Sequence, residues 1–359
     1  MKNTQLSLLL LAAGMAVPAL AQPTIPSIIE FDAPGAGTLA YQGTEPQDIN
    51  AAGAITGFYV LPTGDANGFV RAPDGTFTTF AIPGAEITVP ESINPIGAIA
   101  GYSCYNAVCS GFSRTPAGDI TTFVVPGGGT GEGQGTFVWN INPSGEIAGT
   151  YVDANNVTHG FVRAPGGAIN SFDAPGAGTG AYQGTYMASY EGLNVEGQIA
   201  GWYVDANNVY HGYVRAPDGT ITTFNAPGAG TGAYQGTLCY GVNPAGETPG
   251  VYYDATGALH GFLRYRSGTF VDVAVPGAAS TNVQNISPLG AINGDWYDTN
   301  NASHGFVRAL DGNIIIFDAP GAGTASGQGT FAGGINTSSQ TTGYYIDGNN
   351  VYHGFLWTP

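Results

Sequence analysis

Five histidines and a recurrent acidic segment are the residues of this chain whose types best suit chemistry. Each histidine opens a His-Gly-Phe or His-Gly-Tyr tripeptide, and Asp-x-Asn-Asn precedes four of the five (His159, His211, His260, His304 and His353). Imidazoles bind zinc when several ligands converge on one point. Equivalent positions of successive repeats are spread apart, so we interpret each histidine as a hydrogen-bonding group of its own repeat.

The Asp-x-Asn-Asn segments could bind Ca²⁺, because carboxylate and amide oxygens suit a hard cation. Their first residues are Asp153, Asp205, Asp298 and Asp347. One such segment offers fewer oxygens than the roughly six to eight that Ca²⁺ takes. Asp and Asn are also ordinary turn residues. We therefore expect turns here and no cofactor, with a Ca²⁺ site as the alternative.

One column of the repeat varies while its neighbours stay nearly uniform. It lies two residues before the apolar residue of an Ile-Asn motif and holds Gln47, Glu91, Trp139, Glu191, Tyr240, Gln284 and Gly333. Aromatic and amide groups stack on and hydrogen-bond to neutral polar ligands. A repeat protein that binds an asymmetric ligand must break its own symmetry, so these side chains, the glycine excepted, are the candidate ligand-binding residues. The alternative is that the column is merely unconstrained.

The same column allows an enzyme. Glu91 and Glu191 could act as acid and base on a polysaccharide, in a hydrolase or lyase, with Tyr240 assisting. Such a reaction needs the two carboxyl groups within about 10 Å and burial that raises one pKa. No Ser/His/Asp arrangement points to catalysis, so we favour a non-catalytic binding protein. A structural or adhesion role is a second alternative.

Two of the three cysteines are spaced for a disulfide. Cys104 and Cys109 flank the tip of one hairpin, where other repeats carry Asp-x-Asn-Asn. In an exported protein this spacing predicts a bond across the hairpin. Cys239 is left over, and we interpret it as a small buried apolar residue.

The elements that must position these residues are short strands separated by turns. Each repeat has four strand-like pieces, as in residues 141–175, and seven copies follow one another at spacings of 43 to 52 residues. Glycine and proline fall in the turns between the pieces. The pattern predicts an all-β protein, a seven-bladed β-propeller of four-stranded antiparallel blades. An open β-solenoid or a stacked sandwich is the alternative.

The two ends of the chain predict how the ring closes. Residues 27–32 resemble a fourth strand without the other three, whereas the last repeat, 329–357, has three strands and stops. Pairing them completes the last blade and removes open edges, in a single domain of residues 22–359. Strand order also places the Asp-x-Asn-Asn tips and the Tyr-Gln-Gly-Thr loops on one face, with the variable column at the channel mouth of that face.

These repeats resemble the extracellular repeat family named for its His-Ala-Phe (HAF) tripeptide. The matching elements are a Gly-Ile-Asn-like segment (192–194 and 334–336), Gly-x-Ile-x-Gly, and the tripeptide itself with Gly in place of Ala. The resemblance covers all seven repeats and implies export and a propeller-like β fold. It implies no activity and no catalytic residues.

Composition and charge limit the classes of partner that this chain can bind. Residues 1–21 have the composition of a signal peptide, with Lys2, an apolar run and a small-x-small end at Ala21, so we expect a secreted or periplasmic protein without membrane insertion. Eight Lys and Arg stand against 25 Asp and Glu, a formal net charge of −17, which repels nucleic acid and anionic lipid. We expect a monomer that binds a small neutral polar ligand, glycan or peptide.

Six arginines share one column, where we expect them to pair with carboxylates (Arg71, Arg114, Arg163, Arg215, Arg264 and Arg308).

Overall fold

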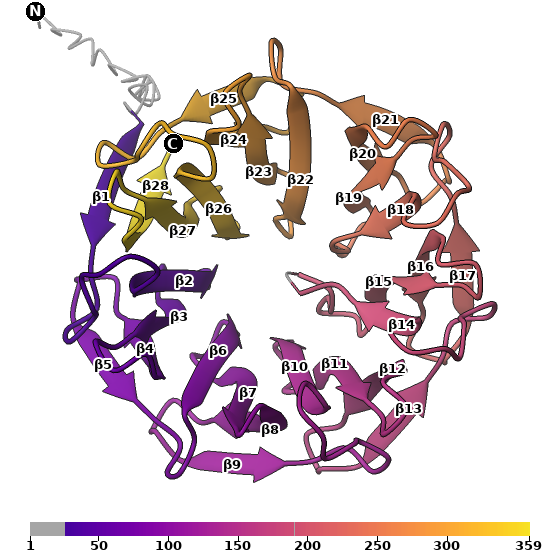
Figure 1. Cartoon of the computed structure of the whole chain (residues 1–359), viewed down its shortest axis with the longest axis horizontal. Coiled ribbons are helices and arrows are strands. Elements are labelled where there is room, and N and C mark those ends of the chain that lie inside the picture. The colour runs from indigo at the N-terminus through magenta and orange to yellow at the C-terminus, as the bar shows by residue number, and fades with distance from the viewer. Residues whose placement is uncertain (1–25, 190) are drawn as a thin grey trace, which may run out of the picture.

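The computed structural model describes residues 26–189 and 191–359, so the predicted signal peptide, residues 1–21, lies outside the described residues. The described residues form 28 β-strands. Figure 1 shows these strands arranged in a ring about a central axis. In the described part of the chain, no helix is long and apolar enough to cross a membrane.

The strands pair antiparallel in consecutive groups of four, which we number as sets in chain order. Set 1 comprises β2 (Gly43–Ile49), β3 (Ile55–Val60), β4 (Ala66–Arg71) and β5 (Phe77–Phe80). Set 2 comprises β6 (Ile87–Ile93), β7 (Ile99–Tyr105), β8 (Val108–Arg114) and β9 (Ile120–Phe123). Set 3 comprises β10 (Gly135–Ile141), β11 (Ile147–Val152), β12 (Thr158–Arg163) and β13 (Ile169–Phe172).

The remaining sets follow the same order. Set 4 comprises β14 (Gly184–Met187), β15 (Ile199–Val204), β16 (Tyr210–Arg215) and β17 (Ile221–Phe224). Set 5 comprises β18 (Gly236–Cys239), β19 (Thr248–Tyr253), β20 (Leu259–Arg264) and β21 (Phe270–Val273). Set 6 comprises β22 (Ser280–Ile286), β23 (Ile292–Tyr297), β24 (Ser303–Arg308) and β25 (Ile314–Phe317). Set 7 comprises β26 (Gly329–Ile335), β27 (Thr341–Ile346), β28 (Tyr352–Thr358) and β1 (Ser27–Phe31).

The first strand completes the last set. β1 pairs antiparallel with β28, from Ser27 opposite Thr358 to Phe31 opposite Gly354, and the two strands lie side by side in Figure 1. The predicted all-β architecture is confirmed, and the predicted pairing of the first strand with the last is present. The ladder covers strand edges that would otherwise stay open to other chains.

A glycine at the start of β2, the first strand of set 1, brings neighbouring sets together. Gly43 pairs in parallel with Tyr352 of set 7. A Cβ atom on Gly43 would lie 1.9 Å from the carbonyl oxygen of Tyr352, and its φ of +126° is also a conformation that glycine alone adopts readily. The Gly of the Gln-Gly-Thr motif is therefore fixed by the close approach of two sets.

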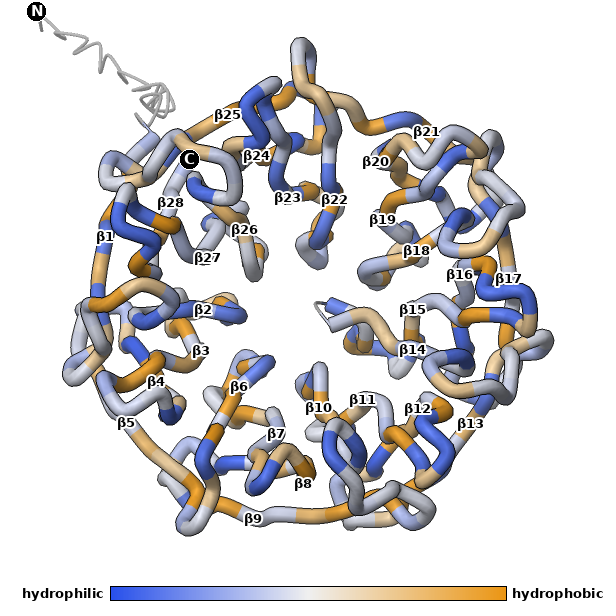
Figure 2. The backbone as a smooth tube through the Cα atoms, viewed as in Figure 1, coloured by the Kyte–Doolittle hydropathy of each residue, from blue (hydrophilic) through white to orange (hydrophobic). Residues whose placement is uncertain are grey.

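The core lies between neighbouring sets. The aromatic residue of each tripeptide, for example Phe161, is almost fully buried, and Figure 2 shows hydrophobic positions recurring in the strands all the way round the ring. Glycine precedes this aromatic residue because a Cβ on Gly160 would lie 2.5 Å from the ring of Phe172. That contact leaves no room for a side chain at this position.

The arginine column differs from the expectation. The guanidinium of Arg71 lies 4.7 Å from the ring centroid of Phe31, in the preceding set. Four more arginines lie over phenylalanines of the preceding set in the same way (Arg114, Arg163, Arg215 and Arg264). Each of these cations lies over an aromatic face between two sets, and none forms a close ion pair with a carboxylate of the described residues. The charges of Asp74 and Asp218 still interact with Arg71 and Arg215.

Candidate functional site

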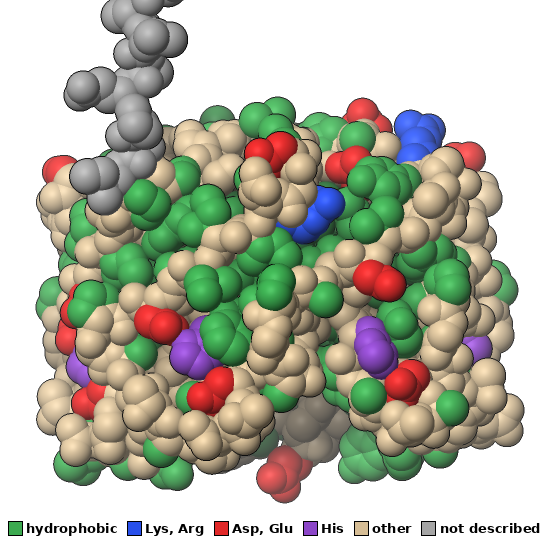
Figure 3. All heavy atoms as spheres, turned by 90° about the horizontal axis from the view of Figure 1, so that it is seen from above, with side chains coloured by type: hydrophobic (Ala, Val, Ile, Leu, Met, Phe, Trp, Pro, Cys, Tyr) green, Lys and Arg blue, Asp and Glu red, His purple; other side chains and the backbone are tan. Residues whose placement is uncertain are grey.

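The histidines lie on the outer wall and are held within their own sets. His159 Nδ1 lies 2.9 Å from Asp173, and its ring stacks on Tyr151 at 4.8 Å. Figure 3 shows histidines beside carboxylates on the rim, apart from one another. Within residues 26–189 and 191–359, no group of three or more His, Cys, Asp and Glu side chains could hold a metal ion. The interpretation of each histidine as a group of its own repeat is confirmed.

The Asp-x-Asn-Asn segments form turns that use their own carboxylates. Asp153 Oδ1 accepts hydrogen bonds from the backbone N–H groups of Asn155 and Val157, both at 2.8 Å. The same pair of bonds recurs at Asp205, Asp298 and Asp347. Side-chain-to-backbone bonds of this kind stabilise tight turns. Turn formation accounts for these oxygens, and the Ca²⁺ alternative stays a prediction.

The loops that end in Gln-Gly-Thr, which we call the long loops, connect neighbouring hairpin tips. The N–H of Tyr182 donates to the carbonyl of Asn156 in set 3 at 2.7 Å. The side chain of the next residue, Gln183, donates to Asn208 Oδ1 in set 4 at 2.9 Å. The prediction that tips and loops share one face is confirmed, and we call it the hairpin-tip face. The Gln of the motif is therefore a structural link between sets.

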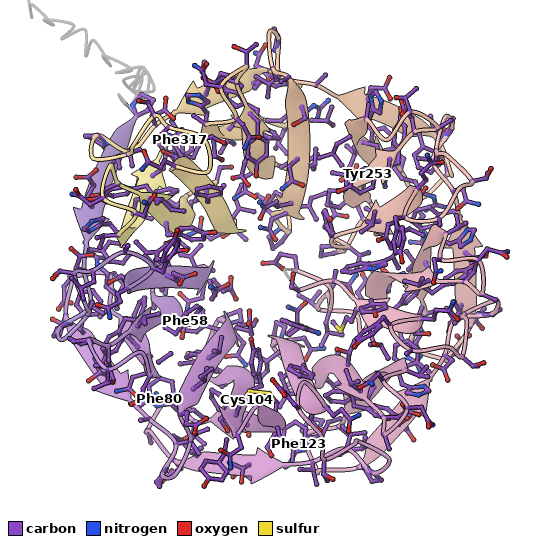
Figure 4. All side chains as sticks on the ribbon, in the orientation of Figure 1. Phe58, Phe80, Cys104, Phe123, Tyr253 and Phe317 are labelled. Atoms are coloured by element: carbon purple, nitrogen blue, oxygen red, sulfur yellow. A yellow bond between two sulfur atoms is a disulfide. The ribbon has the colours of Figure 1, made fainter. Side chains whose placement is uncertain are left out.

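The disulfide prediction is confirmed. Cys104 and Cys109 are bonded across the hairpin of β7 and β8, and Figure 4 shows Cys104 and the bond between the two strands. The disulfide replaces the carboxylate-centred turn of the other repeats. Cys239 is buried, and burial raises the pKa of its thiol to about 12, so it is an inert core residue.

A cavity of about 230 Å³ lies on the axis at the end opposite the hairpin-tip face. The first strands run from the hairpin tips to Asn-Pro turns, and these turns form the entrance, which we call the Asn-Pro end. Its wall consists of the apolar residues of the Ile-Asn motifs and the residues of the turns (Ile49, Ile93, Ile141, Leu193, Val242, Ile286, Ile335, Pro95, Pro143, Val195, Pro244 and Pro288). Asparagines of the same motifs also line it, so the entrance is mainly apolar with amide groups at its rim.

A belt of asparagines frames this entrance. Asn50 Nδ2 donates to the carbonyl of Asn94 in the next set at 3.2 Å, and Asn94 donates to Asn142 in the same way. The chain of bonds begins at Asn336 and continues through Asn194 to the carbonyl of Asn243. Because each bond crosses between sets, the asparagine belt holds the cavity rim in a fixed shape.

The floor of the axial cavity is polar. Asp48, Ser92, Asn140 and Glu191 line it. Asp48 Oδ2 accepts a hydrogen bond from Ser92 Oγ at 3.0 Å, and Asn140 Oδ1 accepts one from the N–H of Leu193 at 2.8 Å. The floor therefore offers carboxyl, hydroxyl and amide groups at the end of an apolar funnel.

A second, inner cavity of about 10 Å³ adjoins this floor and is lined by Asp48, Glu91, Asn140, Glu191, Asn285 and Gly334. It has room for about one water molecule. Asn285 is fully buried, and its Oδ1 accepts no hydrogen bond from the described residues. The inner cavity itself is too small for anything larger than a water molecule.

Burial raises the pKa values of the carboxyl groups beside the axis, Asp48, Glu91 and Glu191. Burial, together with the smaller contributions of the charges of Glu45 and Asp48, raises the pKa of Glu91 to about 8. Burial also raises the pKa of Glu191, with a second contribution from the charge of Asp48. Folding then binds protons, so these groups lower the stability as the pH rises above about 4.5. The raised pKa values of Asp48 and Glu191 make the floor less anionic than the sequence indicates.

The structure brings only part of the predicted column together. Glu191 lines both cavities and Glu91 lines the inner one. Trp139 lies instead against Tyr102 and donates from Nε1 to Thr150 Oγ1 at 3.1 Å.

The other three predicted side chains lie away from the two cavities. The ring of Tyr240 contacts Trp202 at 5.7 Å, Gln284 Nε2 donates to Asp295, and Gln47 is buried in β2. None of the three lines the axial or the inner cavity. A ligand-binding role for Gln47, Trp139, Tyr240 and Gln284 stays a prediction.

The axis-facing residues that sequence reasoning missed lie in the next column of the repeat, one residue after the predicted one. Asp48, Ser92, Asn140 and Asn285 follow the predicted residues directly. The pairing of β2, β6, β10 and β22 with their partners shifts register at the predicted position. A β-bulge adds one unpaired residue and changes which side chains face a given side. This next column is not uniform, contrary to the prediction from sequence. It holds Asp, Ser, Asn or Gly, and that variation was the signal available.

Set 4 breaks the symmetry of the ring most strongly. Leu193 follows Gly184 by nine residues, whereas Ile141 follows the equivalent Gly135 by six. Figure 1 shows the segment after β14 reaching toward the axis. Glu191 lies on this insertion with a φ of +39°, so the three extra residues place one carboxyl group in the axial cavity.

Comparison with family models and with curated proteins gives no match. Among solved structures, the virginiamycin B lyase of Staphylococcus aureus matches at 14% identity and a TM-score of 0.59, over 93% of this chain and 100% of that chain. The β-propeller domain of the Trilobed protease from Pyrococcus furiosus matches at 11% identity and a TM-score of 0.51, over 89% of this chain and 94% of that chain. The fold is a β-propeller. The BP39L lectin from Burkholderia pseudomallei matches at 11% identity and a TM-score of 0.56, over 87% of this chain and 96% of that chain. At these identities the likeness shows the fold alone.

Proposed function

We propose that the protein is an exported, non-catalytic propeller of seven four-stranded blades that binds a neutral polar ligand, glycan or peptide, in its axial cavity. The antiparallel pairing of each set of four strands supports the blade count. The disulfide and the composition of residues 1–21 support export.

The observation that carries the proposal is the axial cavity itself. About 230 Å³ of space ends on carboxyl, hydroxyl and amide groups, and the hydrogen-bonded belt keeps its rim open. An apolar funnel with a few convergent polar groups is the usual form of a small-molecule site. Because burial raises the pKa of Glu191, the floor is less anionic than its carboxyl groups indicate, and an uncharged ligand suits it better than a cation does.

A substitution at the rim tests this site. Val195 lines the entrance and is half exposed, so Val195→Trp narrows the cavity with little effect on folding. Val124→Trp is the matched control, at an exposed valine away from the axis. On a glycan array and a peptide array, we expect wild type and Val124→Trp to share a ligand that Val195→Trp loses at least tenfold. No ligand for wild type, or equal binding by Val195→Trp, would contradict the proposal.

An enzyme acting on a polysaccharide is the second candidate, because Glu91 and Glu191 both line the inner cavity and both have raised pKa values. A protonated carboxyl at neutral pH is what a general acid requires. The inner cavity, however, admits only about one water molecule, so a sugar could reach Glu191 but not Glu91. Turnover of a polysaccharide that Glu91→Gln abolishes, with folding intact, would establish the enzyme instead.

A further inference from the structure

Three loop tyrosines on the hairpin-tip face are exposed, and the fold does not use their rings. Tyr41, Tyr182 and Tyr234 occupy equivalent positions in the long loops, and 71%, 76% and 68% of their surfaces are exposed. Among the described residues, no hydrogen bond or ring contact holds any of these three rings. A single exposed aromatic residue is ordinary, but exposure repeated at one position of one face indicates a contact surface.

The backbone makes tyrosine an unfavourable choice at this position. The φ values of Tyr41, Tyr182 and Tyr234 are +67°, +65° and +63°, in the left-handed region that disfavours bulky residues. Two other long loops have glycine at the same place, Gly133 and Gly327, with φ values of +74° and +80°. Glycine is therefore sufficient for the conformation of the loop, and the tyrosine ring must have a role other than holding that conformation.

The equivalence of these positions follows from their hydrogen bonds. The N–H of Tyr182 donates to the carbonyl of Asn156 at the preceding hairpin tip, and the N–H of Gly327 donates to the carbonyl of Asn301. Tyr41 and Tyr234 make the same bond to Asn350 and Asn208.

Each tyrosine thus stands on a hairpin tip that also exposes an amide side chain. The asparagine before the bonded one is exposed in all three tips (Asn155, Asn207 and Asn349). An aromatic face stacks on the apolar face of a sugar ring, and an adjacent amide can donate to and accept from its hydroxyl groups. The three tyrosine–asparagine pairs combine both contacts.

Charge and repetition narrow the ligand. A formal net charge of −17 disfavours nucleic acids and acidic polysaccharides, although both could stack on or bond to such pairs. Three copies of one small site, at separate junctions of the ring, suit a ligand that repeats along its length. We propose that the three tyrosine–asparagine pairs form a second binding surface, on the hairpin-tip face, for a neutral polysaccharide.

Affinity electrophoresis in native gels tests the proposal, with dextran, mannan, arabinoxylan or mixed-linkage β-glucan as the dissolved probe. We expect at least one polysaccharide to retard the wild-type protein. Each of Tyr41→Gly, Tyr182→Gly and Tyr234→Gly should weaken the apparent affinity roughly three- to tenfold, and the triple variant should lose it. Because glycine suits the positive φ, the midpoint of thermal unfolding should stay equal or rise in every variant.

A gain of binding sharpens the test. A Cβ on Gly327 meets no atom within 4 Å, and the tip below it is a complete Asp-x-Asn-Asn segment, so Gly327→Tyr should strengthen retardation. Adding Asn300→Ala should remove that gain. Gly84→Tyr is the control, at a glycine with positive φ and open space that lies outside the long loops.

The outcomes separate this surface from the axial cavity. Wild-type mobility that is unchanged in all four gels, or a triple variant that is still fully retarded, would overturn the proposal. Val195→Trp, which narrows the axial cavity, should leave retardation unchanged. If Val195→Trp abolishes retardation and the tyrosine variants do not, the polysaccharide binds on the axis and the hairpin-tip surface does not exist.

Discussion

Two junctions of the ring are built from the same repeat and bonded differently. Between sets 7 and 1, a parallel bridge joins Gly43 to Tyr352, Asn336 donates across the junction to the carbonyl of Asn50, and Arg71 lies over Phe31. Between sets 5 and 6, the structure shows no parallel bridge and no belt bond in the described residues. Serine stands where the bridge glycine and the belt asparagine would be (Ser280 and Ser287).

Apolar packing joins sets 5 and 6 instead. Leu263 and Val273 of set 5 are buried in one cluster with Val283 and Phe306 of set 6. Hydrogen bonds need fixed geometry, whereas apolar contact depends mainly on buried area. Five other junctions have the same parallel bridge as the junction of sets 7 and 1. The comparison therefore indicates that directional bonds fix the register at most junctions, while packing suffices between sets 5 and 6.

Of the changes that test this comparison, removing β1 should lower the free energy of unfolding most. A chain that lacks residues 26–31 loses the partner of β28 and the ring beneath Arg71. We expect a loss of at least about 5 kcal/mol in the free energy of unfolding, which is comparable to the whole stability of many domains. Urea denaturation followed by circular dichroism measures it, with a chain that begins at residue 26 as the control. An unchanged cooperative transition would show that the closing ladder is dispensable.

A methyl group on the bridge glycine should come next. Gly43→Ala places a Cβ against the Tyr352 carbonyl at a φ that alanine avoids, so we expect a loss of about 3–5 kcal/mol. Ser280→Ala at the equivalent place in set 6 should cost less than about 0.5 kcal/mol. Urea midpoints of the two variants give the comparison directly. Equal losses would mean that the bridge carries no special role.

The asparagine belt should give a smaller difference. Asn336→Ala and Asn243→Ala both remove an amide that organises its own turn, but only Asn336 also donates to the next set. We expect Asn336→Ala to cost about 1 kcal/mol more than Asn243→Ala, the usual value of one hydrogen bond. The same denaturation experiment measures both. If Asn243→Ala is the costlier variant, the belt does not stabilise the ring.

The smallest effect should come from pH at the closing ladder. The hydrogen bond to Asp32 raises the pKa of His353 above its ordinary value, and Asp32 follows β1 directly. The resulting stabilisation is complete below about pH 6.5 and is lost as the pH rises through the raised pKa. Asp32→Asn copies the Asn225 partner of His211 in set 4.

The stability difference between wild type and Asp32→Asn should shrink between pH 6 and pH 9. Because Asp32 is half exposed, the difference should stay under about 1 kcal/mol. Urea midpoints at several pH values measure it. A difference that is constant with pH would assign the contact no ionic character.

The repeat made the overall architecture predictable from sequence. Three signals each correspond to a feature of the structure: the regular spacing of the seven copies, the lone strand at residues 27–32, and the two cysteines of one hairpin tip. These signals can be read from sequence because they are local: they lie in turns and in residues that alternate along a strand.

The site was less predictable, for two physical reasons. The β-bulges move the axis-facing position from Gln47 to Asp48, and a bulge leaves no reliable mark in sequence. The arginines lie over Phe rings because neighbouring sets bring β1 and β4, for example, together, which periodicity within one repeat does not show. The insertion before Leu193, by contrast, was readable from spacing alone.

The ladder between Ile28 and Trp357 also limits when the protein can fold. During synthesis, the ribosome releases the first strand of the ring more than 300 residues before its partner. A contact of such long range makes folding slow, and it leaves every nascent or prematurely terminated chain with two unmatched edges. Only a chain translated through β28 can pair β1 with its partner and bury both edges.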